Sequence, residues 1–541
     1  MFVHEIIAAE VAATGTSTVF GLLGDANLFM VNSFVEKQGG RYISAVHESS
    51  AVMMAFGYAC RTGGLGVATV TQGPGLANTA TALIESVRSG APVLLITGDT
   101  APNNTINQQT LDQEPFVRAT GAGYVLVNRP EDAASAVRLA ARQAVAQSRP
   151  VVLNCPTEYM WESVESDSGG AGARGQAEAD ADPLSEDAIG EAVAVIAAAR
   201  RPLVLAGRGV TDKQQRQAVL AFAERIGAPI VTTLRARNLY SAAEGCAGVC
   251  GTVSTEVGMQ SISESDAIIA FGASLNTFTT LRNSLLAGKR VVQVDVDRAR
   301  FRPSVPVTAG VLGDAATVAA VFVEWLDAAE VPASGFRERM AARVSQPDLS
   351  WDAPLEATVT LAGVLSAVNR ALPAQRTVVT DGGRFQGESF KYLWGTDFRS
   401  EVQTTTFGAV GMGMGAAIGA AAAAAPDEPT VLVTGDGGFM MNGMAELHSA
   451  IRADLPLVVV ICNDGSYGAE YDQFVNRGVR ADLSLFDWPD FADVARSLGA
   501  LGLTIDRVQD VAPAVAALGT PGRPVVVDVR IAPQDIPEVP H

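Results

Sequence analysis

Two short apolar runs in the C-terminal part of the chain each end in a polar segment that contains glycine. Residues 431–434 lead into Gly-Asp-Gly-Gly at 435–438, and residues 457–461 lead into Cys-Asn-Asp-Gly at 462–465. The intervening stretch at 443–452 has the pattern of a helix, which predicts a crossover between two parallel strands. Because open α/β sheets bind ligands at the carboxyl ends of their strands, we expect both polar segments at one crevice.

The residue types in these segments favour a metal and a diphosphate. Asp436 offers a carboxylate, Asn463 lies 27 positions later and offers a carboxamide, and Gly465 offers a backbone carbonyl. Hard oxygen ligands of this kind suit Mg²⁺, which keeps open positions for phosphate oxygens. Glycines let the chain approach phosphates closely and present N–H groups to them. The predicted diphosphate contacts are Gly435, Asp436, Gly437, Gly438, Asn463 and Gly465.

Composition agrees with a large globular enzyme and excludes several partners. The 541 residues are 48% hydrophobic and 18% charged, and their net charge is −19. Such acidity disfavours nucleic acid and anionic membranes as partners, because both bind clustered Lys and Arg side chains. The N-terminus has no basic segment of a secretory signal, and the five cysteines are scattered. We therefore expect a cytoplasmic protein with reduced thiols and no zinc site.

Alternating helical and strand-like patterns predict an α/β protein with three doubly wound domains and mainly parallel sheets. The expected domains are residues 1–161, 186–340 and 355–541, and residues 162–185 form a linker with few large apolar side chains. The expected strands are 19–22, 42–46, 66–70, 93–96 and 151–153 in the first domain, 202–207, 267–272 and 291–295 in the second, and 377–380 in the third, after a helix from Thr360.

These features together resemble a known family. The Gly-Asp-Gly segment followed by Asn463 is similar to the thiamine diphosphate motif, and the three units resemble the pyrimidine-binding, central and diphosphate-binding domains of the acetolactate synthase, pyruvate decarboxylase and benzoylformate decarboxylase family. Cys462 stands where the family usually has a first Asn, and Asn463 matches the ligand. The resemblance implies thiamine diphosphate and Mg²⁺ as cofactors.

The first domain carries the matching catalytic position. Glu48 follows the expected strand at 42–46 and precedes an expected helix at 51–59. In the family the corresponding glutamate hydrogen-bonds N1′ of the aminopyrimidine and so promotes removal of the proton from C2 of the thiazolium. The alternative is a glutamate at a helix start, where it favours the helix dipole. We predict Glu48 as catalytic and cofactor-binding.

Three further positions in this domain match family segments. Gly73 lies in a segment that resembles the Ser-Gly-Pro-Gly loop of acetolactate synthases, although a structural turn explains it as well. Gln109 matches the Gln of a segment that lines the substrate pocket, and Thr110 replaces the family's Glu. Asp25 matches the Asp of the Gly-Asp-x-Asn segment of pyruvate and indolepyruvate decarboxylases, where it transfers protons, but it could equally be a helix N-cap. Gln109 and Asp25 are thus candidate catalytic residues.

A glycine-rich segment at 406–415 resembles the family segment that bends the cofactor. Its glycines also mimic a dinucleotide fingerprint, but they precede an Ala-rich helix and follow no clear strand, so a Rossmann site is disfavoured. By the resemblance, Gly408 offers a carbonyl to the 4′-amino group and Val410 is the apolar wedge, smaller than the usual Met or Leu. Asp381 and Gly383, after the strand at 377–380, are expected at the diphosphate end.

Histidine is scarce, which bears on the reaction. The four histidines match none of the paired or active-site histidines of the family's decarboxylases, and Glu470 lies one residue from a catalytic Glu of pyruvate decarboxylases, though a surface role is favoured for it. We predict non-oxidative decarboxylation of a 2-oxo acid with ligation to a second carbonyl, such as an aldehyde. The alternatives are a 2-oxo acid decarboxylase that releases an aldehyde, of the benzoylformate or indolepyruvate kind, and an inert homologue.

The resemblance also bears on a second cofactor and on assembly. Residues 272–276 lack the arginine and acid cluster of the flavin-binding acetolactate synthases, so FAD is not expected. The family joins its first and third domains across a subunit interface, which implies a homodimer or homotetramer.

Overall fold

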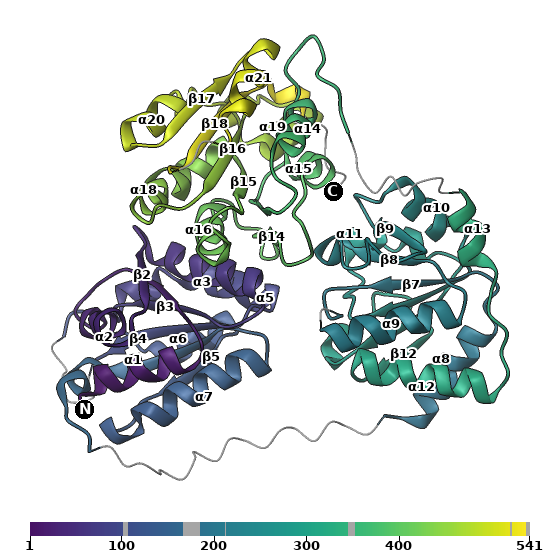
Figure 1. Cartoon of the computed structure of the whole chain (residues 1–541), viewed down its shortest axis with the longest axis horizontal. Helices are drawn as coiled ribbons and strands as arrows, with labels where there is room; N and C mark the ends of the chain where they lie inside the picture. Colours follow the sequence, from purple (N-terminus) through teal and green to yellow (C-terminus); the bar gives the residue numbers. More distant parts are fainter. Residues whose placement is uncertain (101–106, 166–183, 211, 344–351, 520–521, 537–541) are drawn as a thin grey trace. The chain divides into compact units, whose positions relative to one another are not determined.

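The computed structural model describes residues 1–100, 107–165, 184–210, 212–343, 352–519 and 522–536. Over these residues the chain forms three six-stranded sheets, each flanked by helices (Figure 1). Every pair of neighbouring strands is parallel. The predicted fold class of three α/β domains with parallel sheets is confirmed.

The first sheet has the strand order β2-β1-β3-β4-β6-β5, so its strand order reverses between β1 and β3. One strand, β5, had no counterpart in the sequence prediction because it is a four-residue edge strand that is only partly buried. The strands are β1 Thr18–Gly21, β2 Arg41–Ser44, β3 Gly66–Val70, β4 Val93–Asp99, β5 Gly123–Leu126 and β6 Val151–Pro156. The helices are α1 Val3–Ala13, α2 Leu28–Gln38, α3 Glu48–Thr62, α4 Pro74–Ala77, α5 Ala80–Ser89, α6 Gln113–Thr120 and α7 Ala133–Ala146.

The third sheet has the same pattern, with the order β14-β13-β15-β16-β18-β17. Its strands are β13 Thr377–Thr380, β14 Glu401–Gln403, β15 Thr430–Gly435, β16 Leu457–Asn463, β17 Leu501–Ile505 and β18 Val525–Arg530. Its helices are α14 Leu361–Ala371, α15 Gln386–Tyr392, α16 Gly413–Ala423, α17 Asp436–Gly438, α18 Met444–Arg452, α19 Gly468–Asn476, α20 Phe491–Leu498 and α21 Val508–Ala516, with a π-helical turn, η6, at Phe439–Gly443.

The central sheet belongs to a separate compact unit of residues 176–351, whereas residues 1–175 and 352–539 together form the other. Its order is β12-β11-β10-β7-β8-β9. Most of the predicted linker lies outside the described residues, and the predicted domain boundaries stay predictions. The elements are α8 Glu186–Ala197, β7 Pro202–Ala206, α9 Lys213–Arg225, β8 Ile230–Thr233, β9 Cys246–Cys250, α10 Glu256–Glu264, β10 Ala267–Phe271, α11 Thr277–Thr280, β11 Arg290–Asp295, β12 Ala309–Leu312, α12 Ala315–Ala328 and α13 Phe336–Arg343.

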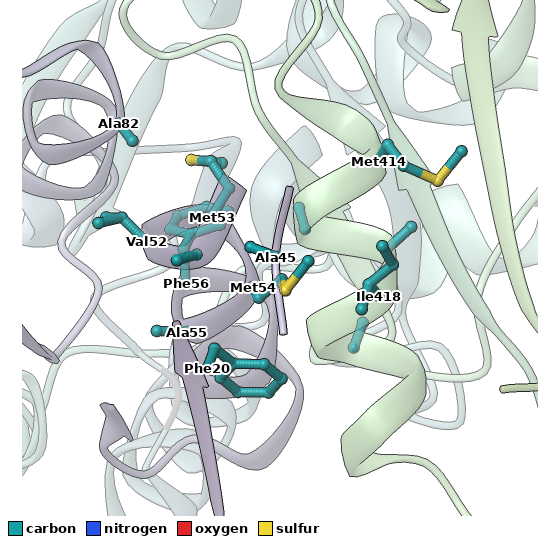
Figure 2. Close-up of a cluster of buried hydrophobic side chains, with 14 of the residues drawn as sticks. Phe20, Ala45, Val52, Met53, Met54, Ala55, Phe56, Ala82, Met414 and Ile418 are labelled. Atoms are coloured by element: carbon teal, nitrogen blue, oxygen red, sulfur yellow. The ribbon is translucent and has the colours of Figure 1, made fainter. Parts of the chain in front are cut away.

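Within the larger unit, α3 of the first domain packs tightly on α16 of the third (Figure 2). A Cβ atom on Gly57 would lie 1.9 Å from the carbonyl oxygen of Ala416, and one on Gly419 would lie 1.8 Å from that of Met54. The two backbones therefore approach so closely that both positions require glycine. Buried side chains such as Met54 and Ile418 fill the surrounding core.

Two expectations from composition can be compared with this structure. All five cysteines are free thiols. None of the described helices is long and apolar enough to cross a membrane.

Candidate active site

Asp436 lies at the start of a helix at the carboxyl end of β15. Helical backbone begins at this residue in α17, continues through the π-helical turn η6 and ends with α18. The predicted helix over 443–452 is confirmed as α18, whereas the helical turns before it, α17 and η6, were not predicted. Glycine has a poor helix propensity, which is why the pattern at 437–438 did not indicate helix. The helix N-terminus gives this segment backbone N–H groups suited to phosphate oxygens.

The carboxyl group of Asp436 is buried and held by two backbone amides. Its side chain accepts hydrogen bonds from the N–H of Gly437 at 2.6 Å and from the N–H of Gly465 at 2.8 Å. Burial, together with the nearby Asp464, raises the pKa of Asp436 to about 7. A carboxylate in such a position calls for a positive charge beside it. This feature fits a divalent cation.

Asn463 ends the neighbouring strand β16 and is oriented by β18. Its Nδ2 donates to Oδ1 of Asp528 at 2.9 Å, which leaves the carboxamide oxygen to face another ligand. Asp528, which the sequence did not single out, is fully buried. The predicted metal ligand Asn463 thus presents the atom type that Mg²⁺ prefers.

Gly465 is brought beside Asp436 but is already engaged. It has a φ of +63°, and its carbonyl oxygen accepts the N–H of Phe486 at 2.8 Å. A carbonyl oxygen has a second lone pair, so one site on this oxygen remains for a metal. The described residues contain no cluster of three or more His, Cys, Asp or Glu suited to a metal, but the predicted set includes only one residue of those types.

The side chain of Asp381 is buried and makes its hydrogen bonds within the third domain. It is 1% exposed, and burial raises its pKa. A direct contact with a cofactor would therefore use the backbone around Gly383, whose φ is +155° and where a Cβ would lie 2.3 Å from the ring of Phe385. The donors to its carboxylate are the N–H groups of Gly382, Gly411 and Met412 and the hydroxyls of Thr404 and Thr434.

These bonds tie the candidate wedge segment to the sheet. Gly408 has a φ of +88°, with no atom within 4 Å of a Cβ built on it. The side chain of Val410 is 41% exposed. Both residues are accessible to a ligand, as the resemblance predicts for a segment that contacts the cofactor.

Glu48 is the first residue of α3, three residues earlier than the predicted helix. His47 is the N-cap, and its Nδ1 accepts the N–H of Ser49 at 3.1 Å, which starts the helix here. Oε2 of Glu48 accepts a hydrogen bond from Nδ2 of Asn78 at 3.0 Å. Oε1 lies 3.7 Å from a Cβ built on Gly75, so the glycine loop lies against this carboxyl group. Asn78 was not predicted, because an Asn after a short turn carries no distinctive signal.

Asp25 and Gln109, 84 residues apart in the chain, line one pocket of about 350 Å³. Asp25 is not the N-cap of α2; that residue is Asn27, whose Oδ1 accepts the N–H of Gly24 at 2.9 Å. The structural alternative for Asp25 is therefore wrong. The remaining lining residues are Gln72, Asn107, Gln108, Thr157 and Glu158.

Gln72 is a further residue of this pocket that the sequence did not indicate. It is 4% exposed, and its Nε2 donates to Oε1 of Gln109 at 2.8 Å. The adjacent Gly73 has a φ of +58°, its N–H donates to Oε1 of Gln113, and a Cβ there would lie 2.1 Å from the carbonyl oxygen of Gln109. Gly73 therefore fixes the loop that borders the pocket.

Glu470, for which a surface role was favoured, lies exposed on α19.

The segment around Glu48 also contacts the third domain. The N–H groups of Val46 and His47 donate to the buried carboxylate of Glu446, and Nδ2 of Asn442 donates to Oγ of Ser50 at 2.8 Å. These contacts join the start of α3 to the helix that begins at Asp436. Neither Glu446 nor Asn442 was predicted, since a polar residue in an amphipathic helix is usually read as solvent-facing.

Parallel sheets with glycine-rich segments at their carboxyl ends are typical of α/β enzymes that bind a cofactor. Sequence models of three domains of thiamine pyrophosphate enzymes match the chain: the N-terminal TPP binding domain at residues 1–116, the central domain at 189–322 and the C-terminal TPP binding domain at 381–529. The chain belongs to the thiamine pyrophosphate enzyme family. It is therefore an enzyme that depends on thiamine diphosphate and acts on small molecules, which confirms the predicted family.

Relatives of several activities are similar to this chain over nearly its full length. A sulfoacetaldehyde acetyltransferase of Alcaligenes xylosoxydans xylosoxydans is 27% identical over 95% of this chain and 90% of its own. A probable 2-ketoarginine decarboxylase of Pseudomonas aeruginosa is 29% identical over 90% and 86%. An acetolactate synthase large subunit of Haemophilus influenzae is 26% identical over 93% and 89%. The reactions that the names of these relatives give differ from one another.

Proposed function

We propose that this enzyme decarboxylates a 2-oxo acid without oxidation and ligates the remaining acyl unit to a second carbonyl compound. The observation that carries the proposal is the buried carboxyl group of Asp436 at the start of a helix, which accepts the N–H groups of Gly437 and Gly465 and supports a cation site there. Thiamine diphosphate, when bound, supplies a nucleophilic carbon that attacks the 2-oxo group.

Asp436, Asn463 and the carbonyl of Gly465 are proposed to hold Mg²⁺. Burial disfavours the ionised form of the Asp436 carboxyl group, and a divalent cation beside it would stabilise that ionised form. The N–H groups at the start of α17 would hold the diphosphate, with Gly435, Gly437 and Gly438 allowing close approach.

Glu48 is proposed to hold a proton at N1′ of the aminopyrimidine. Its Oε2 is fixed by Asn78, and the neighbouring oxygen is left to face a ligand. Gly408 and Val410 would border the same ring system, because both are accessible and their segment is tied to the sheet by Asp381. A carboxyl group with one oriented oxygen suits general acid and base work.

The pocket that contains Asp25 and Gln109 supports ligation over release of an aldehyde. Its lining includes carboxylates and amides but no histidine among the described residues. Without a histidine in the lining to deliver a proton, the acyl unit would remain available longer for ligation to a second carbonyl compound. Relatives named as an acetyltransferase and as an acetolactate synthase accord with such a reaction.

A second candidate function is decarboxylation with release of an aldehyde. Asp25 favours it, because this carboxyl group is exposed toward the pocket and could deliver a proton. A relative named as a probable 2-ketoarginine decarboxylase also accords with it.

Product analysis separates the two functions. Purified enzyme with thiamine diphosphate and Mg²⁺ would be given a panel of 2-oxo acids, first alone and then with an aldehyde. Ligation predicts a 2-hydroxy ketone or 2-hydroxy-3-oxo acid as the main product, whereas release of stoichiometric aldehyde in both conditions would establish the alternative. If the protein binds the cofactor and no 2-oxo acid loses CO₂, both functions are wrong.

We also propose that the chain acts as a homodimer or homotetramer. Apolar side chains near the candidate cofactor residues are exposed: Phe407 is 36%, Val410 41%, Met441 56% and Tyr467 37% accessible. Exposed apolar groups gathered at a functional edge are typical of surfaces that a partner covers. Sedimentation analysis tests this, and a monomer that keeps full activity would contradict it.

A further inference from the structure

Two buried glutamates connect the first and third domains in a reciprocal way. Glu446 of α18 and Glu85 of α5 are both 0% exposed. Each accepts backbone N–H groups from a segment of the other domain. A buried carboxylate needs such donors, and its bonds to them are stronger than those between neutral groups.

Glu446 holds the segment in front of Glu48. Its Oε1 accepts the N–H of Val46 at 2.8 Å and the N–H of His47 at 2.9 Å, and its Oε2 accepts Oγ–H of Ser449 at 2.9 Å. His47 is the N-cap of α3, so the position of these two amides sets where the helix begins. The carboxyl group of Glu48 is thereby placed by a side chain of the third domain.

Glu85 holds the segment in front of Gly408. Its Oε1 accepts the N–H of Thr406 at 3.1 Å and its Oε2 accepts the N–H of Phe407 at 2.6 Å. Oγ of Ser89 also donates to Oε1 at 2.8 Å. The guanidinium of Arg88, on the same helix, lies 4.6 Å from the centre of the Phe407 ring. The segment that carries Gly408 and Val410 is thereby placed by the first domain.

We propose that Glu446 and Glu85 are positioning residues of the active site, each fixing in one domain the cofactor-facing segment of the other. The inference rests on the proposed roles of Glu48, Gly408 and Val410. Under this proposal, both activation and binding of the cofactor require correct docking of the first and third domains.

The two carboxylates differ in a way that a conservative substitution reveals. Glu446 receives both amides on one oxygen, so the carboxamide oxygen of Gln could accept both while its NH₂ donates to the Ser449 hydroxyl. Glu85 receives its two amides on different oxygens, so the NH₂ group of Gln would face one N–H donor. We expect Glu446→Gln to keep kcat and the Kd for thiamine diphosphate within threefold of the wild-type values. Glu85→Gln should raise that Kd at least tenfold.

Alanine variants should separate the two roles. Glu446→Ala should lower kcat at least tenfold with less than threefold change in the Kd for thiamine diphosphate, because it releases Glu48. Glu85→Ala should raise that Kd at least tenfold, because it releases residues 406–410. Hydrogen exchange in the cofactor-free protein should accelerate at Val46 and His47 in the first variant and at Thr406 and Phe407 in the second.

Glu428→Gln is the matched control. Glu428 pairs with Arg61 of α3 at 2.7 Å and is buried between the same two domains, at the end of α3 far from Glu48. The Glu428→Gln substitution should lower the melting temperature and leave kcat and the cofactor Kd within twofold of the wild-type values. If Glu446→Ala and Glu85→Ala behave as this control does, or if Gln is tolerated equally at both positions, the inference is wrong.

Two further results complete the test. If the alanine variants do not fold, the contrast between the two glutamine variants decides. Wild-type protein that binds the cofactor without consuming any 2-oxo acid would instead overturn the proposed function, and the exchange measurements would still judge the positioning.

Discussion

Gly465 donates its backbone N–H to Oδ2 of Asp436 at 2.8 Å, although 29 positions separate the two residues in the chain. This bond joins the carboxyl ends of β15 and β16, which are neighbours in the sheet with Gly435 opposite Cys462. The candidate metal ligands are therefore preassembled by the backbone.

Asp436 should make the stability of the metal-free protein depend on pH. Its pKa of about 7 lies above the usual 3.8, so the stability that this protonated carboxyl group contributes is full below pH 4 and is lost as the pH rises from 4 through 7. The cost near pH 8 is on the order of 2–4 kcal/mol. Thermal unfolding without metal should show this loss for wild type and a flatter profile for Asp436→Asn. Mg²⁺ with thiamine diphosphate should restore stability in wild type only, and equal profiles of the two proteins would contradict the assignment.

Glu48→Gln should reduce turnover by roughly 10²–10⁴-fold, because Gln cannot exchange a proton with the aminopyrimidine. Release of CO₂ from a 2-oxo acid measures the loss, and thermal unfolding should be little changed. Glu131→Gln, at an exposed glutamate of the same domain, is the control. Undiminished turnover in Glu48→Gln would remove the proposed activation step.

Asp528 should tune the metal site through Asn463. Loss of its carboxylate in Asp528→Ala frees the Asn463 side chain, and we expect Mg²⁺ affinity to fall roughly 10–100-fold, as for other groups that orient metal ligands. Asp528→Asn keeps an acceptor for Asn463 and should lose much less. Titration of Mg²⁺ at saturating thiamine diphosphate gives both values. Equal affinities in all three proteins would show that Asn463 does not bind the metal.

Val410→Leu should narrow the room beside the cofactor. The larger side chain adds a methylene at an accessible position, which is worth about 10–200-fold in discrimination. The ratio of kcat/KM for a bulky 2-oxo acid to that for pyruvate should fall. An unchanged ratio would refute the wedge assignment.

Gly73 and Gly408 should differ in their tolerance of alanine. Both have positive φ, which costs alanine about 1–2 kcal/mol. At Gly73 the added Cβ would also lie 2.1 Å from the carbonyl oxygen of Gln109, whereas at Gly408 it would meet nothing within 4 Å. Overpacking adds about 1–3 kcal/mol, so denaturant unfolding should show Gly73→Ala as the less stable variant. A Gly408→Ala protein of equal or lower stability would contradict this reading.

Most of the fold could be predicted from local patterns, because buried parallel strands read as short apolar runs between helices. Strands β3 and β13 have the predicted bounds, whereas the short edge strand β5 carried too weak a signal. The helix at 444–452 was predicted, whereas the helical turns before it at 436–443 were not, because they contain glycines at 437, 438 and 443. In the candidate site, most of the residues found from sequence lie in segments that follow strands, and several of these segments are rich in glycine.

The α/β class, the family and the candidates Glu48, Asp436 and Asn463 could be predicted from the amino-acid sequence, because spacing along strands and turns is local information. The folded structure was needed to reveal that Asp528 orients Asn463, that Asn78 holds Glu48, and that Glu446 and Glu85 join the two domains. These contacts connect residues between 30 and 400 positions apart. No local pattern encodes such a pairing, because it arises only when packed helices and sheet edges bring a donor and an acceptor together.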